Sequence, residues 1–188
     1  MKNLLVILIC LSAWTYSSAQ SSYFPVEPGK KWTYAFGKDI YGGTPYENYI
    51  TEVAIQRDKE IIDGKSYYVL TSSSGLVTSE NSAIKTYVGF SADGAILSKV
   101  EGTDKFYTTM NRNPKVGDEF LSPTGGTSKV ISLNASITSP TDSYDDCLLI
   151  EMADSDLVMR SYYKKGVGLV VHCMVVEGTE KIFTYLLE

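Results

Sequence analysis

The chain is poor in the residues that most metal centres and nucleophilic catalytic sites require. It contains one histidine, His172, and three cysteines in 188 residues. No C-x-x-C or H-x-x-x-H spacing occurs, so we expect neither a metal nor a cofactor. His172 and Cys173 are neighbours on an expected strand, where adjacent side chains point to opposite faces, so they cannot act as a Cys–His pair. We therefore predict that the protein is not an enzyme.

Basic residues and long apolar runs are also scarce. Lys and Arg number 17 against 22 Asp and Glu, a formal net charge of −5. Because the sequence shows no basic patch and a net negative protein repels a polyanion, nucleic acid is excluded as a partner. Beyond the N-terminus no apolar run approaches the roughly 20 residues that a membrane-spanning helix needs. We expect no integral membrane segment in the mature protein.

The N-terminus carries an export signal. Lys2 provides a positive start, Leu4 to Ile9 begin an apolar core that continues to about Trp14, and small residues up to Ala19 provide a cleavage site. This pattern predicts a signal peptide over residues 1–19 and a mature chain that begins at Gln20. The mature protein is then periplasmic or extracellular.

Cys10 raises the alternative of a lipid anchor. A lipoprotein signal requires a small residue directly before the modified cysteine, but here that residue is Ile9, and the apolar core ahead of it is very short. We therefore expect Cys10 to be removed with the signal, and the protein to be soluble rather than lipid-anchored.

The rest of the chain has an apolar period of two rather than 3.6. Alternation is clear in Lys31–Phe36 and Tyr49–Ile55, and short β-branched or aromatic runs separated by turn signals such as Asp63-Gly64 continue to the C-terminus. No stretch shows helical periodicity. The pattern predicts one all-β domain over residues 20–188, an antiparallel meander of about ten strands that forms a curved sheet or an open barrel.

Internal similarity indicates that this domain has two related halves. VEGTDKFYT at 100–108 matches VEGTEKIFT at 176–184, and DGKSYYVL at 63–70 resembles YDDCLLI at 144–150. Gly29 and Trp32 are spaced like Gly117 and Phe120. These matches occur in order with steadily changing offsets, as a duplication with shorter loops in the second copy predicts. We expect halves at about 24–110 and 111–188 that superimpose strand for strand.

Two further motifs carry a family resemblance. FPVEPGKKWTY near the N-terminus resembles the FPxxxGxxWxY start of a group of uncharacterised exported proteins and lipoproteins of Gram-negative bacteria. DCLLIE followed by KGVGLV resembles the D-C-L-x-I and K-G-V-G-L-V motifs of the same group. The resemblance implies an envelope location and an all-β fold, but it implies no activity.

Cys147 and Cys173 remain in an exported mature chain and could form a disulfide there. With hairpin turns near residues 153–156 and 165–168, Cys147 is expected opposite Tyr162 and Cys173 opposite Arg160. The cysteines are then two strands apart, about 9–10 Å, which exceeds the roughly 7 Å between Cα atoms that a disulfide spans. We predict two free thiols.

Binding residues are harder to identify from the sequence. Tyr41 and Tyr46 place aromatic rings on a glycine-rich loop, where they either contact a ligand or fold over the end of the sheet. We expect a binding protein that holds an unknown small molecule, lipid or glycan, or an envelope protein, on the concave face of its sheet. Two alternatives remain: an enzyme acting on envelope or dietary polysaccharide through two of the 22 acidic residues, and a structural or assembly component without a small-molecule site.

Overall fold

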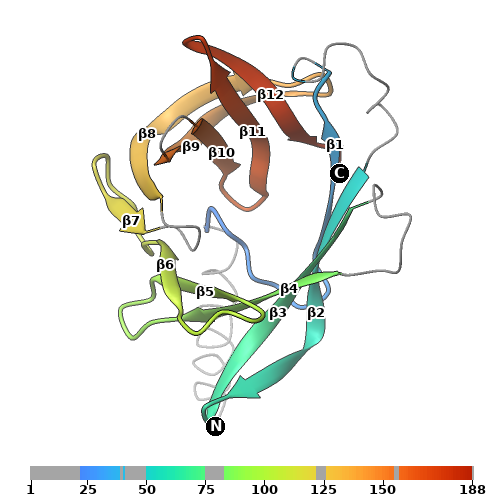
Figure 1. Ribbon diagram of the computed structural model, residues 1–188, viewed down its shortest axis with the longest axis vertical. Helices are drawn as coiled ribbons and strands as arrows, with labels where there is room; N and C mark the ends of the chain where they lie inside the picture. Colours follow the sequence, from blue (N-terminus) through green and yellow to red (C-terminus); the bar gives the residue numbers. More distant parts are fainter. Residues whose placement is uncertain are drawn as a thin grey trace, which may run out of the picture.

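A computed structural model describes residues 22–38, 40, 50–74, 83–121, 126–154 and 157–187 (Figure 1). These residues form one sheet of twelve antiparallel strands, and no helix occurs among them. The first six strands are β1 (Lys31–Phe36), β2 (Ile50–Ile62), β3 (Lys65–Ser74), β4 (Ile84–Phe90), β5 (Ile96–Val100) and β6 (Tyr107–Met110). The other six are β7 (Glu119–Leu121), β8 (Thr127–Thr138), β9 (Ser143–Asp154), β10 (Leu157–Lys164), β11 (Gly168–Val176) and β12 (Thr179–Leu186).

The strands form two meanders that meet at β1 and β12. The order in the sheet is β6-β5-β4-β3-β2-β1-β12-β11-β10-β9-β8-β7, so each strand pairs with its sequence neighbour and β1 pairs with β12. β6 and β7 lie beside each other at the two ends of this order without a backbone ladder between them (Figure 1). The sheet is therefore a nearly closed barrel whose open seam runs between β6 and β7.

This architecture confirms the predicted all-β antiparallel fold. The sheet has twelve strands rather than about ten, and β7 is the strand without an expected run, because it has only three residues and shows little alternation. β2 is longer than the expected run and continues to Ile62, where Asp63 and Gly64 form a two-residue hairpin turn with φ angles of 51° and 74°. Positive φ at both central residues matches the twist of the flanking strands and fixes their register.

The predicted division of the domain falls at the seam, because β6 ends at Met110 and β7 begins at Glu119. The sequence matches lie on strands of equal rank in the two halves, with the VEGT segments spanning the β5–β6 and β11–β12 hairpins. The backbone also repeats. Gly29 N–H donates to Ile55 O in β2 at 2.9 Å, and Gly117 N–H donates to Val130 O in β8 at 2.9 Å. In each half the apolar residue then donates back to the residue after the glycine. The superposition of the complete halves stays a prediction.

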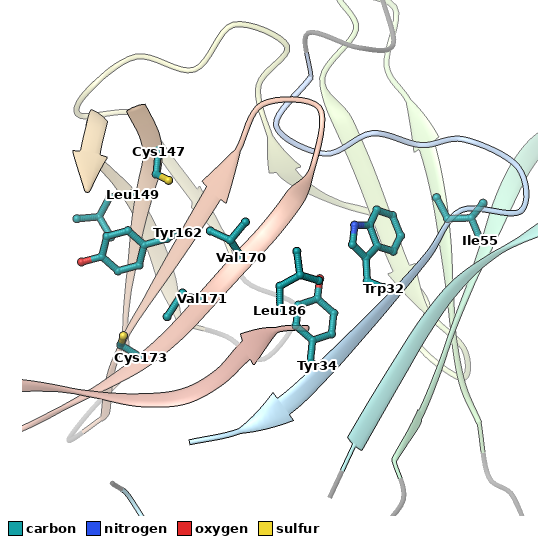
Figure 2. Packing of buried hydrophobic residues seen from close by; sticks show 10 residues of the cluster. All are labelled: Trp32, Tyr34, Ile55, Cys147, Leu149, Tyr162, Val170, Val171, Cys173 and Leu186. Atoms are coloured by element: carbon teal, nitrogen blue, oxygen red, sulfur yellow. The ribbon is translucent and has the colours of Figure 1, made fainter. Parts of the chain in front are cut away.

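Two apolar clusters fill much of the interior. The first contains ten buried residues from β1, β2 and β9–β12, and Figure 2 shows its members: Trp32, Tyr34, Ile55, Cys147, Leu149, Tyr162, Val170, Val171, Cys173 and Leu186. The second cluster joins β4–β6 to β7–β9 across the seam and consists of Tyr23, Val88, Ile96, Met110, Phe120, Val130, Leu148 and Ile150. Residues 147–150 of β9 are all buried, so this strand contributes side chains to both clusters.

The segment Ser22–Lys30 crosses the middle of the molecule before it enters β1 (Figure 1). Tyr23 and Pro25 on this segment are buried. Two hydrogen bonds attach the segment to the turn between β10 and β11. Gly166 N–H donates to Ser22 O at 2.9 Å, and Lys30 Nζ donates to Gly166 O at 2.9 Å. The segment is thus a fixed internal element rather than a loose terminus.

Trp32 continues this attachment at the start of β1. Its indole Nε1–H donates to Val167 O at 2.6 Å, and its ring stacks on Phe24 with 6.4 Å between centroids. Tyr34 O–H donates to Leu169 O at 3.1 Å. The N-terminal motif and the K-G-V-G-L-V motif therefore bind each other directly. We call this contact, formed by Trp32, Tyr34 and residues 166–169, the motif clasp.

Candidate functional site

A cavity of about 730 Å³ lies between the N-terminal segment and the inner face of β3–β6. Its volume falls within the roughly 300–1,000 Å³ typical of small-molecule sites. The N-terminal segment forms one wall with Ser22, Tyr23, Phe24 and Val26. The strands and the loops that follow β4 and β6 form the rest: Tyr68, Phe90, Asp93, Gly94, Ile96, Met110, Asn111, Arg112 and Asn113.

Cross-strand pairing explains the apolar wall of the cavity. Phe90 on β4 pairs with Ile96 on β5, which pairs with Met110 on β6, so the three side chains form a row on one face. Tyr68 on β3 lies beside this row and contacts Phe90 edge to face, with 6.5 Å between ring centroids. Ile96 and Met110 are almost fully buried, but Phe90 keeps 53% of its surface exposed. Phe90 thus offers apolar area that a ligand can cover.

The cavity becomes polar at the loop after β6. A second hollow of about 280 Å³ adjoins it and shares four of its residues, Asp93, Asn111, Arg112 and Asn113. Lys115 and Asp118 complete this smaller hollow, which we call the polar annex. All six residues that line the polar annex are charged or carry an amide. The whole site therefore has an apolar part and a polar part.

Both carboxylates of the polar annex accept hydrogen bonds from residues of their own turns. Asp118 Oδ2 accepts hydrogen bonds from Asn111 Nδ2 at 2.8 Å and from Lys115 N at 2.9 Å. Asp93 Oδ1 accepts from the Ser91 hydroxyl and from Ala95 N. The side-chain donors Asn111 and Ser91, followed by these backbone amides, lower the pKa of Asp118 and of Asp93 below its ordinary value. Both groups are therefore ionised at neutral pH.

The cations of the polar annex form no close ion pair with any described residue, although the charge of Lys115 also helps to lower the pKa of Asp118. Among the described residues, no carboxylate lies within ion-pair distance of Arg112 or Lys115. The Arg112 side chain lies across Gly94, where a Cβ atom would come within 2.8 Å of Arg112 Cδ. The absence of a side chain at Gly94 thus leaves room for Arg112, which lines both the cavity and the polar annex.

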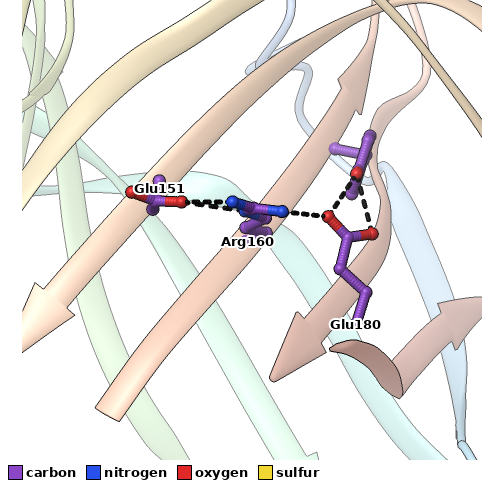
Figure 3. A network of polar contacts seen from close by, with 4 residues as sticks. Glu151, Arg160 and Glu180 are labelled. Carbon is purple, nitrogen blue, oxygen red and sulfur yellow. Dashed lines mark hydrogen bonds and ion pairs between the residues drawn. The ribbon is translucent and has the colours of Figure 1, made fainter. Parts of the chain in front are cut away.

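A second polar cluster lies on β9, β10 and β12. Arg160 bridges Glu151 and Glu180 with N–O distances of 2.8 and 2.7 Å, and the Tyr162 hydroxyl hydrogen-bonds to Glu180 at 3.0 and 2.9 Å (Figure 3). Burial, the hydrogen bond to Glu180 and its charge together raise the pKa of Tyr162. Arg160 is shared by the two carboxylates, and the network links side chains of β9, β10 and β12.

Cys147 and Cys173 are both free and buried. Cys173 lies opposite Arg160, as predicted, but Tyr162 pairs with Leu149 and not with Cys147. The predicted register for Cys147 is wrong by two residues because β9 extends to Asp154 and the β9–β10 connection is shorter than assumed. Burial raises the pKa of the Cys173 thiol to about 12 and also raises that of Cys147, which makes both thiols poor nucleophiles.

The sequence-based binding candidates Tyr41 and Tyr46 lie outside the described residues, as do the predicted signal peptide and Cys10. Sequence reasoning missed Phe90, Arg112 and Asn113. The Asn-Arg-Asn-Pro segment that follows β6 is the available signal for them, because it places a cation and two amides at a strand end.

No group of three His, Cys, Asp or Glu side chains within the described ranges could hold a metal ion. Within the same ranges, no helix is long and apolar enough to cross a membrane.

Comparisons with known proteins give little beyond the fold. No family model and no curated protein matches the chain. A solved structure from Parabacteroides distasonis ATCC 8503, provisionally named a lipoprotein, is similar, with a TM-score of 0.52 over 89% of this chain and 98% of that chain. The two sequences are 14% identical, so the likeness supports the shared all-β fold.

Proposed function

We propose that the chain is an exported, non-enzymatic binding protein of the bacterial envelope, and that it holds a small ligand in the cavity between the N-terminal segment and β3–β6. The observation that carries this proposal is the cavity itself. It combines about 730 Å³ of space with an aromatic and aliphatic wall and a few polar groups at one end, which is the usual composition of a small-molecule site. The signal sequence and the resemblance to exported proteins support the location.

The wall of the cavity is well suited to a ligand because it is built on a fixed scaffold. Tyr68, Ile96 and Met110 project from paired strands. The opposite wall is anchored because Gly166 N–H donates to Ser22 O and Phe24 stacks on Trp32. A rigid site loses little conformational entropy when a ligand binds. These features support a ligand site on the face of β3–β6 that the cavity adjoins.

The cavity gives less support to the alternative that the protein is a polysaccharide-cleaving enzyme. Acid catalysis of glycoside hydrolysis needs one carboxyl group with a raised pKa. Asp93 is the carboxylate on the cavity wall, Asp118 lies in the polar annex, and hydrogen bonds lower the pKa of each. Neither is therefore prepared to donate a proton.

The proposal can be tested with 1-N-phenylnaphthylamine, a neutral apolar dye that fluoresces when it leaves water. We expect the purified protein to bind it and Phe90→Ser to weaken binding about tenfold, because roughly 50 Å² of covered apolar surface at about 25 cal/mol per Å² is worth about 1.3 kcal/mol. Ile84→Ser is the matched control, since Ile84 lies on the same strand with 59% exposure but does not line the cavity. Equal loss in both variants, or no binding by the parent protein, would contradict the proposal.

A further inference from the structure

The cavity and the polar annex together form one site with two chemical environments, and they meet at Arg112. The larger space has an apolar wall, and the smaller one is lined by charged and amide side chains only. A purely apolar ligand would leave the polar annex filled with water, and a purely polar ligand would leave the exposed ring of Phe90 uncovered. A molecule with an apolar body and one polar head matches both environments.

The charged side chains of the polar annex that lack a close partner indicate the sign of the ligand's head group. Formal charge in the polar annex balances, because Arg112 and Lys115 face Asp93 and Asp118. Their hydrogen-bonding states differ, however. Each carboxylate already accepts two hydrogen bonds from its own turn, whereas neither cation has an ion-pair partner within the described part of the chain. The donors of the Arg112 guanidinium are therefore free to bind a carboxylate, a geometry that arginine favours.

We propose that the site binds a single amphipathic anion, with an aliphatic body against Phe90, Ile96 and Met110 and a carboxylate at Arg112. This inference rests on the proposed binding function of the cavity and adds the chemical class of the ligand. Arg112 selects the anion, and the apolar wall of the cavity, with the exposed ring of Phe90 as its largest open part, supplies most of the affinity. Because Arg112 is exposed, its ion pair is screened by water and salt and contributes selectivity of about fivefold rather than several orders of magnitude.

The test uses three competitors of equal chain length against the neutral dye: dodecanoate, dodecanol and dodecylammonium. We expect dodecanoate to displace the dye at about fivefold lower concentration than dodecanol, with dodecylammonium the weakest. Arg112→Gln should abolish this preference, and Arg112→Lys should retain part of it. Arg57→Gln, at an exposed arginine on β2 that does not line the cavity, is the matched control and should leave the preference unchanged.

Chain length provides an independent readout of the apolar body. Affinity should rise about two- to fourfold for each added methylene from octanoate to dodecanoate, because each buried CH₂ contributes up to about 0.8 kcal/mol. The rise should stop once the chain fills the cavity. An affinity independent of chain length would overturn the amphipathic ligand.

The outcomes separate this inference from the proposed function. If the dye binds in a Phe90-dependent way but the three head groups compete equally, the cavity binds ligands and the anionic class is wrong. The anionic class is also wrong if dodecylammonium competes best, if none of the three competes, or if the protein binds phosphatidylglycerol vesicles but not monomeric dodecanoate. If neither the dye nor dodecanoate binds, both proposals fail.

Discussion

Gly168 is where the motif clasp is most sensitive to a single added carbon atom. Its φ angle is 110°, a conformation that side chains rarely adopt, and a Cβ at this position would lie 3.1 Å from Trp32 Nε1 and 3.4 Å from Trp32 Cε2. The indole cannot readily retreat, because it is 5% exposed, donates to Val167 O and stacks on Phe24. We therefore expect Gly168→Ala to strain the backbone and to displace the tryptophan.

Gly178 provides a comparison in which the crowding is absent. It also has a positive φ, 75°, but nothing lies within 4 Å of the position that its Cβ would take. Gly178→Ala should therefore cost the backbone penalty alone, about 1 kcal/mol. Gly168→Ala adds the crowding of a buried ring, about 1–3 kcal/mol for overpacking, for a total near 3 kcal/mol.

Urea unfolding followed by tryptophan fluorescence measures both costs. The chain has two tryptophans, and because Trp14 lies in the predicted signal peptide, Trp32 is the remaining reporter in a mature chain. With a slope of about 2 kcal/mol per molar urea, the midpoint should fall by about 0.5 M for Gly178→Ala and about 1.5 M for Gly168→Ala. Equal midpoint shifts would refute the claim that Gly168 is required by its contact with Trp32.

Three further predictions concern titration, thiol reactivity and processing. Burial lowers the pKa of His172 to about 4. The unfolded chain therefore takes up a proton between about pH 6.5 and 4 that the folded protein does not, and the free energy of unfolding should fall by about 2–3 kcal/mol over that range. A pKa near 6.5 in an NMR titration of this single histidine would contradict the burial. Cys173, with a pKa of about 12, and Cys147 should both resist iodoacetamide at pH 8 until denaturant is added. The free energy of unfolding should decline above about pH 9, where unfolding releases the Cys173 proton. Rapid labelling of the native protein would show that the thiols are accessible. The exported protein should begin at Gln20 by intact mass, and an acylated Cys10 at the N-terminus would replace the soluble form with a lipid-anchored one.

The sequence was sufficient for the fold class because the signals for it are local. Alternation of period two is visible in Lys31–Phe36 without knowledge of any partner strand, and Asp63-Gly64 indicates its turn through φ preferences alone. β7 was missed because three residues are too few to establish a period. The Cys147 register was misjudged for a related reason: a difference of two residues in a hairpin connection displaces every pair that follows it.

The motif clasp and the cavity depend on long-range contacts that a sequence pattern does not reveal. Trp32 and Val167 are 135 residues apart, and they meet only because β1 pairs with β12 at the closure of the sheet. The cavity likewise combines Phe24 on the N-terminal segment, Phe90 on β4 and Arg112 after β6. Each of these residues is ordinary in its own segment, and its role appears only when the three segments are brought together.

Methyl NMR with dodecanoate tests the binding site most directly, because it reports position as well as affinity. Ile96 and Met110 line the cavity, whereas Val171 and Met174 on β11 do not. We predict that saturating dodecanoate shifts the methyl resonances of Ile96 and Met110 and leaves those of Val171 and Met174 unchanged. Shifts confined to β11, or no shifts at all, would contradict a ligand site between the N-terminal segment and β3–β6.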